Sequence, residues 1–104
     1  MKYIFEVHIK PGYSAEDYAA VWVEASQRIQ QAPGALGTAL HRHMDDPSVL
    51  LAIAQWESRA LRDAMEAQPQ DEVKRIIQKA APFCEIRPLG AFDDPEWVVM
   101  PPDH

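Results

Sequence analysis

Two histidines near the middle of the chain have the side chains best suited to acid–base chemistry. His41 and His43 stand two residues apart in a stretch of extended character, so they share one face of a predicted strand. An imidazole changes its charge near neutral pH, so either residue could act as a catalytic base. The alternative is that both are surface residues at a strand end, close to the acidic turn Asp45–Asp46.

A third histidine, His8, lies two residues after Glu6 on the first predicted strand, so the carboxylate could orient the imidazole ring. We expect His8 either to contact a substrate or to occupy an exposed or interface surface. The pair His41 and His43 could also bind a metal ion, but no third ligand stands nearby and Arg42 adds positive charge. We therefore expect no metal.

Aromatic residues on a predicted helix could hold a flat ligand. Tyr18 and Trp22 are four residues apart, and with Ala25 and Ile29 they form an apolar stripe. The two rings could stack on an aromatic substrate, or they could be ordinary core residues. Cys84 is the single cysteine, and no base stands beside it in the sequence, so we interpret it as a buried thiol.

The element around which the others are organised is the stretch that begins at Val49. Every residue from Val49 to Ala54 is apolar, and Asp45–Ser48 before it has the composition of a turn. This composition predicts a strand buried on both faces of its sheet. Such a strand needs a covering layer on each side, from this chain or from a second copy of it.

Periodicity and helix breakers predict the order β-α-β-β-α-β. Strands are expected at residues 3–10, 35–43, 49–56 and 83–89, one helix between Ser14 and Pro33, and a second after Ser58 that breaks near Pro69. Right-handed crossovers then place both helices on one face of a four-stranded antiparallel sheet, which is a ferredoxin-like α+β fold. The other face is bare, which predicts a homodimer.

Length and charge limit the function classes. The 104 residues form one domain, and a net charge of −6 without a Lys/Arg cluster argues against nucleic acid as a partner. No apolar run is long enough to cross a membrane, the start lacks a signal peptide, and one cysteine fits a reducing compartment. These features predict a cytoplasmic protein.

We divide the chain into a domain of residues 1–92 and a C-terminal tail of residues 93–104. The tail contains the apolar segment Trp97–Met100. We expect this segment to pack on the body of the molecule or on the partner subunit, because four apolar residues are poorly placed in water.

Several motifs resemble those of the antibiotic biosynthesis monooxygenase family. They are Lys10-Pro11-Gly12, Pro33-Gly34-Ala35-Leu36-Gly37, Asp45-Asp46-Pro47 and Ile53-Ala54-Gln55-Trp56-Glu57-Ser58. The resemblance covers about residues 1 to 90 and implies a dimeric α+β barrel. It also places Trp56 at a position that lines the substrate pocket in some relatives. The alternative is a core tryptophan that closes the turn between strand and helix.

The resemblance leaves three functions open. The first is a cofactor-independent monooxygenase acting on a small phenol or dihydroquinone, with His41, His43 and Trp56 as catalytic candidates and Tyr18, Trp22 and His8 as substrate contacts. The second is a non-catalytic barrel that binds a small hydrophobic ligand, and the third is an isomerase or lyase. Haem degradation does not fit, because haem-degrading members carry an asparagine on strand one and a histidine on helix two, and this chain has neither.

Overall fold

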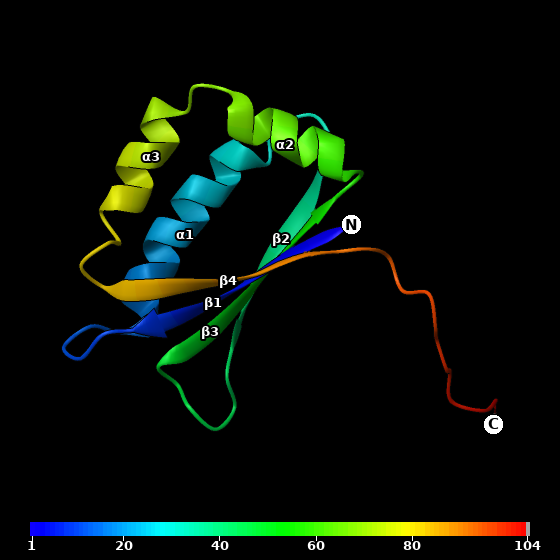
Figure 1. The fold of residues 1–104 in the computed structure, drawn as a ribbon. Helices are drawn as coiled ribbons and strands as arrows, with labels where there is room; N and C mark the ends of the chain where they lie inside the picture. The colour runs from blue at the N-terminus through cyan, green and yellow to red at the C-terminus, as the bar shows by residue number, and fades with distance from the viewer. Residues whose placement is uncertain (104) are drawn as a thin grey trace.

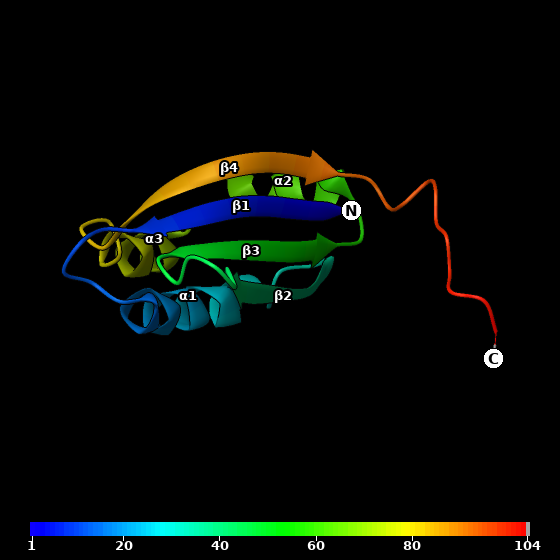
Figure 2. The ribbon, with the colours of Figure 1, turned by 90° about the horizontal axis from the view of Figure 1, so that it is seen from below.

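A computed structural model describes residues 1–103, which form a four-stranded sheet with three helices on one face (Figure 1). The elements are β1 (Lys2–Ile9), α1 (Ala15–Ile29), β2 (Ala35–Arg42), β3 (Val49–Trp56), α2 (Arg59–Ala67), α3 (Asp71–Gln78) and β4 (Cys84–Phe92). The strand order is β2-β3-β1-β4, and all neighbouring strands are antiparallel (Figure 2). This is the ferredoxin-like α+β fold that the sequence predicts.

The helix boundaries follow from side chains at their ends. The Ser14 hydroxyl accepts from the backbone N–H of Asp17 at 3.1 Å, and the Asp17 carboxylate accepts from the backbone N–H of Ser14 at 2.9 Å. Ser58 caps α2 with its hydroxyl. The predicted break near Pro69 is confirmed, since α2 and α3 are separate helices on either side of it. Within residues 1–103, no helix is long and apolar enough to span a membrane.

β3 presents different surroundings to its two sets of side chains. The set that faces the helices is buried, and it consists of Leu50, Ala52 and Trp56. The set that faces away is only half-buried, and it consists of Val49, Leu51 and Ile53. In the single chain, therefore, the helices bury one face of the apolar run and leave the other face partly open to solvent.

β4 continues to Phe92, beyond the predicted end at Leu89. Pro88 suggests an edge strand, and β4 is an edge strand bonded only to β1, where the strand also continues through Gly90. The register with β1 shifts between Ile4 and Phe5, so one residue of β4 bulges out opposite this step.

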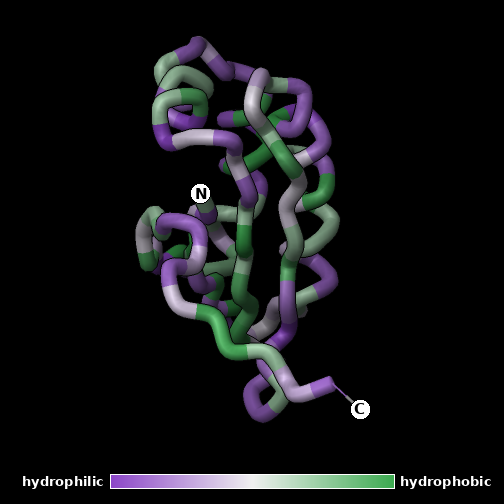
Figure 3. The backbone as a smooth tube through the Cα atoms, turned by 90° about the vertical axis from the view of Figure 1, so that its right-hand side faces the viewer, coloured by the Kyte–Doolittle hydropathy of each residue, from purple (hydrophilic) through white to green (hydrophobic). Residues whose placement is uncertain are grey.

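After β4 the chain runs away from the body (Figure 1), and its hydrophobic segment lies in this projecting part (Figure 3). Trp97 is 86% exposed and Val99 is 96% exposed. The start of the tail is held by Asp94, whose carboxylate lies 3.1 Å from the N-terminal ammonium of Met1. In the single chain the apolar segment of the tail is thus exposed, and its packing on the body or on a partner subunit stays a prediction.

Gly34 lies where the loop after α1 passes close to α2. Its φ of +87° is in the left-handed region, and a Cβ built on it would lie 2.6 Å from Cδ1 of Leu61. Its carbonyl also accepts from the backbone N–H of Glu57 at 2.9 Å. Glycine is thus required at this position by both the backbone conformation and the nearby helix.

We expect Gly34→Ala to lower the free energy of unfolding by about 3 kcal/mol, because strain at positive φ and overpacking against Leu61 add together. Gly12→Ala is the matched control: its φ is +89° and no atom lies within 4 Å of the added Cβ. This control should lose only about 1 kcal/mol, from backbone strain alone. Urea denaturation measures both values, and equal losses would contradict the role given to the Leu61 contact.

Candidate functional site

A cavity of about 530 Å³ lies between the sheet and the helices, and every helix and strand contributes to its wall. A cavity of this size can hold a drug-sized ligand. Its aromatic lining consists of Tyr3, Phe5, Tyr18, Trp22 and Trp56. Its aliphatic lining includes Val21, Ala25, Ile29, Ala54, Met65, Ile77 and Ile86. The wall is therefore mainly apolar, with aromatic side chains from both layers of the fold.

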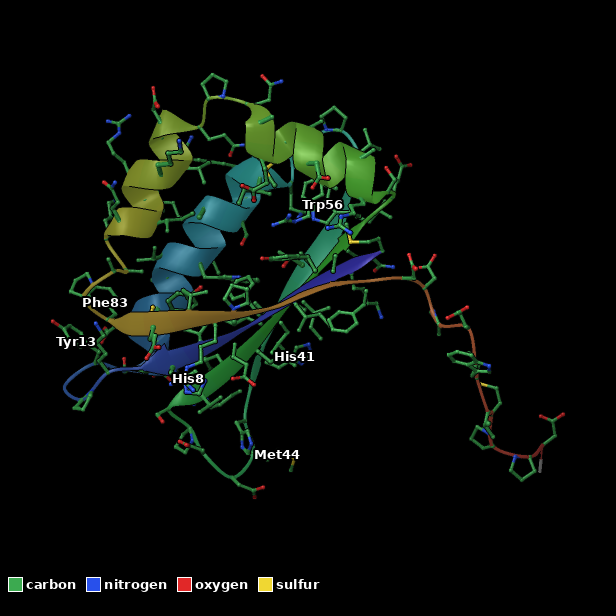
Figure 4. The ribbon with its side chains drawn as sticks, viewed as in Figure 1. His8, Tyr13, His41, Met44, Trp56 and Phe83 are labelled. Atoms are coloured by element: carbon green, nitrogen blue, oxygen red, sulfur yellow. The ribbon has the colours of Figure 1, made fainter. Side chains whose placement is uncertain are left out.

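Three predicted site residues meet in this cavity. Tyr18 and Trp22 come from the stripe of α1 that faces the sheet, and Trp56 ends β3 directly before α2. Trp56 lies between the sheet and α2 (Figure 4) and is 2% exposed. The spacing of four residues on α1 and the last position of β3 therefore bring these rings to one place.

Few polar groups reach the cavity, and two of the uncharged ones are already occupied. The Gln30 side-chain oxygen accepts from the backbone N–H of Gly37 at 2.8 Å, and the Thr38 hydroxyl donates to the carbonyl of Ile53 at 3.2 Å. The charged lining residues are Arg62 and Glu66, both on α2. The cavity thus combines apolar walls with one ion pair.

The Arg62 guanidinium lies over an aromatic ring. Its central carbon is 3.6 Å from the centroid of the Tyr3 ring, which is a cation–π contact. Its Nη2 donates to Oε1 of Glu66 at 3.2 Å. These two contacts hold a positive charge at the edge of the aromatic cavity.

Two acidic groups in the wall keep their protons. Burial raises the pKa of the Tyr18 hydroxyl well above its ordinary range, and the neighbouring Cys84 adds to this effect. Burial also raises the pKa of the Cys84 thiol, and Lys10 only partly opposes the rise. The Tyr18 hydroxyl can therefore donate a hydrogen bond to a ligand at neutral pH, but it is not a base.

The three histidines proposed from the sequence lie outside this cavity. His8 and His41 belong to the sheet face without helices (Figure 4). Nε2 of His8 is 2.9 Å from Oε2 of Glu6, as the sequence spacing suggests. His41 and His43 line a separate depression of about 280 Å³, together with Glu6. Within one chain, the structure therefore separates the histidines from Tyr18, Trp22 and Trp56.

His43 also has a local structural role. Its Nδ1 accepts from the backbone N–H groups of Asp45 at 3.0 Å and Asp46 at 3.1 Å, so it stabilises the turn between β2 and β3. In the part of the chain that the structure describes, no three His, Cys, Asp or Glu side chains come together as metal ligands.

The sequence model of the antibiotic biosynthesis monooxygenase family matches residues 2–77. The chain belongs to the antibiotic biosynthesis monooxygenase family. The match includes β1, α1, β2, β3, α2 and most of α3, so it covers most of the cavity wall. A search of curated proteins gave no match to this chain.

Solved structures share the fold of this family member at low sequence identity. SnoaB, a cofactor-independent oxygenase from Streptomyces nogalater, has a TM-score of 0.70 at 14% identity, over 92% of this chain and 96% of SnoaB. A Deinococcus radiodurans protein carrying the family's name has a TM-score of 0.62 at 18% identity, over 95% and 100% of the two chains. A conserved protein from Methanosarcina mazei has a TM-score of 0.67 at 13% identity, over 86% and 89%.

Sequence reasoning missed three side chains in the cavity of this monooxygenase-family member: Tyr3, Phe5 and Arg62. The alternation of β1 places Tyr3 and Phe5 on its apolar face, so their aromatic character was an available signal. Arg62 is three residues before Met65 on α2, which puts both on one helix face. Its spacing of four residues from Glu66, however, is equally typical of a surface ion pair.

We expect the free energy of unfolding to fall above about pH 10 by up to 1.4 kcal/mol per pH unit through Tyr18. The reason is that the folded protein holds the phenolic proton after the unfolded chain has lost it, so the stabilisation is complete below that pH and declines above it. Urea denaturation between pH 9 and pH 11 measures this slope.

Tyr18→Phe should lack this component of the alkaline slope. Tyr13→Phe, which removes a more exposed hydroxyl, serves as the control and should keep it. If the free energies of unfolding of the wild-type protein and Tyr18→Phe fall in parallel as the pH rises, burial does not raise the pKa of Tyr18 as described.

Proposed function

We propose that the protein is a cofactor-independent monooxygenase that oxidises a small phenol or dihydroquinone-like substrate. The observation that carries this proposal is the aromatic cavity of about 530 Å³, in which Tyr18, Trp22 and Trp56 meet. Flat, electron-rich rings stack on such side chains, and apolar walls exclude water from a reactive anion. Family membership and the shared fold with the oxygenase SnoaB support the same conclusion.

The proposed chemistry requires the substrate to be its own reductant. Loss of a phenolic or benzylic proton leaves a phenolate or enolate, which gives one electron to dioxygen. The resulting radicals combine through a carbon–oxygen bond into a peroxide anion, which takes up a proton. Loss of water then leaves a carbonyl and completes a quinone, so one oxygen atom enters the product and the other leaves as water.

The protein's part in this scheme is to bind and stabilise the anion. The Tyr18 hydroxyl keeps its proton and can donate a hydrogen bond to the substrate oxygen, as can the indole N–H of Trp56. The Arg62 guanidinium supplies positive charge from α2. A base role for His41 or His43 would act at the separate depression rather than in this cavity.

A non-catalytic role is the second candidate. The observation that favours it concerns the lining residues among residues 1–103: Glu66 is their only carboxylate, and none of them is a histidine. A ligand-binding protein needs no proton acceptor there, whereas an oxygenase needs either a base or a substrate that is acidic enough to ionise.

We expect oxygen uptake with anthrone to be catalysed by the wild-type protein and to fall at least about tenfold in Ala54→Leu, a cost of roughly 1.4 kcal/mol in activation free energy. The added side chain would fill cavity space beside Trp56. Ala20→Leu, on the exposed side of α1, should retain the wild-type rate. An oxygen electrode measures the rate, and a melting curve checks that both variants fold.

The same assay separates the candidates for the base. His41→Ala and His43→Ala should retain the rate if the cavity alone carries the reaction. A large loss in either variant would favour the histidine base, and no uptake by the wild-type protein would favour the binding role.

We also propose that two copies form a homodimer through the helix-free face of the sheet, with the tail of each chain packed on its partner. Ile4, Leu51 and Ile53 form adjacent half-buried positions at the centre of this face. The ion pairs His8–Glu6 and Arg87–Glu85 border them. An apolar centre with a polar rim is typical of an interface between subunits.

Sedimentation at micromolar concentration should therefore show a dimer for the wild-type protein and a monomer for Leu51→Glu, because the variant buries an unpaired carboxylate at the proposed interface. Val23→Glu changes an exposed residue of α1 and should remain dimeric. A wild-type monomer, or a Leu51→Glu dimer of wild-type affinity, would contradict this interface.

A further inference from the structure

We propose that Arg62, stacked on Tyr3, is a recognition site for an anionic oxygen group carried by the aromatic ligand. This inference rests on the proposed function only in that it uses the same cavity and an aromatic ligand. It adds a substrate class: aromatic carboxylates or ionised hydroxy-aromatics, in preference to neutral rings of the same size.

The Arg62 guanidinium is positioned by an aromatic ring. Its central carbon lies over the Tyr3 ring, 3.6 Å from the ring centroid. The N–H donors of a guanidinium lie at its edge, where they match the two oxygens of a carboxylate. The contact with Tyr3 therefore holds the guanidinium in place without using its N–H donors, one of which, on Nη2, is bonded to Glu66.

The charge of Arg62 is only weakly compensated inside the protein. Arg62 has an 18% exposed side chain, whereas its partners Glu66 and Asp63 are 58% and 61% exposed. Their distances to the guanidinium are 3.2 Å and 3.9 Å. Ion pairs with such exposed partners are strongly screened by solvent. A ligand anion on the cavity side would meet the same charge in less polar surroundings, where the attraction is stronger.

Among the described residues that line the cavity, Arg62 is the one whose positive charge could pair with an anion. The remaining lining residues are apolar, aromatic or uncharged polar residues, and the acidic group Glu66 would repel an anion. Two uncharged polar groups, on Gln30 and Thr38, already bond within the protein. A ligand anion in this cavity therefore has Arg62 as its partner and must displace Glu66 from it.

The test is calorimetric titration of the full-length protein with 2-naphthoate and with 2-naphthamide, which have similar shape and differ in charge. We expect the carboxylate to bind at least about tenfold more tightly than the amide. Arg62→Gln should weaken binding of 2-naphthoate by about tenfold and leave 2-naphthamide within about twofold. Arg59→Gln, at an exposed position of the same helix outside the cavity, should change neither.

A second variant distinguishes recognition from a structural role of Arg62. Glu66→Gln removes the competing carboxylate, so it should tighten 2-naphthoate binding severalfold without affecting 2-naphthamide. Equal affinities of the two ligands for the wild-type protein, no binding of either, or equal weakening of both by Arg62→Gln would overturn the proposal.

Failure of this inference and failure of the proposed function give different results. Charge-selective binding without oxygen uptake keeps the Arg62 site and refutes the oxygenase. The opposite outcome has two parts: Arg62→Gln leaves oxygen uptake with anthrone unchanged, and the two naphthalene ligands bind equally well. This outcome refutes the Arg62 site and keeps the oxygenase.

Discussion

The structure depends on one constraint: the sheet carries apolar side chains on both faces, but its helices cover only one. The rule that crossovers are right-handed predicts helices on the same side of the sheet, and all three helices lie on one face (Figure 1). On the covered side the side chains of β3 are buried, and next to them the two layers enclose the aromatic cavity. On the other side Leu51 and Ile53 stay half-buried in the single chain. The proposed ligand site and the proposed subunit interface therefore use opposite faces of the same strand.

The chemistry available in the cavity follows from what burial does to its polar groups. Burial keeps Tyr18 and Cys84 protonated, which removes them as bases and retains Tyr18 as a hydrogen-bond donor. The positive charge in the wall is that of Arg62. A site of this composition is better suited to stabilising an anion than to forming one by removing a proton. Its described lining residues include hydrogen-bond donors and the Arg62 cation but no histidine that could act as a base. The proposed oxygenase reaction would therefore require a substrate that is acidic or already ionised, as the proposed electron-rich phenols are.

Most of the fold could be predicted from the sequence because its signals are local. Alternation in β1, the stripe that contains Tyr18 and Trp22, and the break at Pro69 each depend on neighbouring residues. Pro88 suggests the edge position of β4, but the end of this strand could not be predicted, because pairing with β1 carries it past Gly90 to Phe92. Arg62 was missed because its contact with Tyr3 joins residues far apart in the chain. The separation of the histidines from the cavity likewise depends on which face of the sheet receives the helices.

The most direct test of the account uses the indole N–H signals of the three tryptophans, Trp22, Trp56 and Trp97, in a proton–nitrogen correlation spectrum. The protein would be titrated with 1,4-dihydroxynaphthalene under nitrogen, so that binding is observed without oxidation. If the cavity is the ligand site, the signals of Trp22 and Trp56 shift together along one binding curve while that of Trp97 stays in place. Shifts confined to Trp97, or to the imidazole signals of the helix-free face, would contradict the assignment of function to the covered face of the sheet.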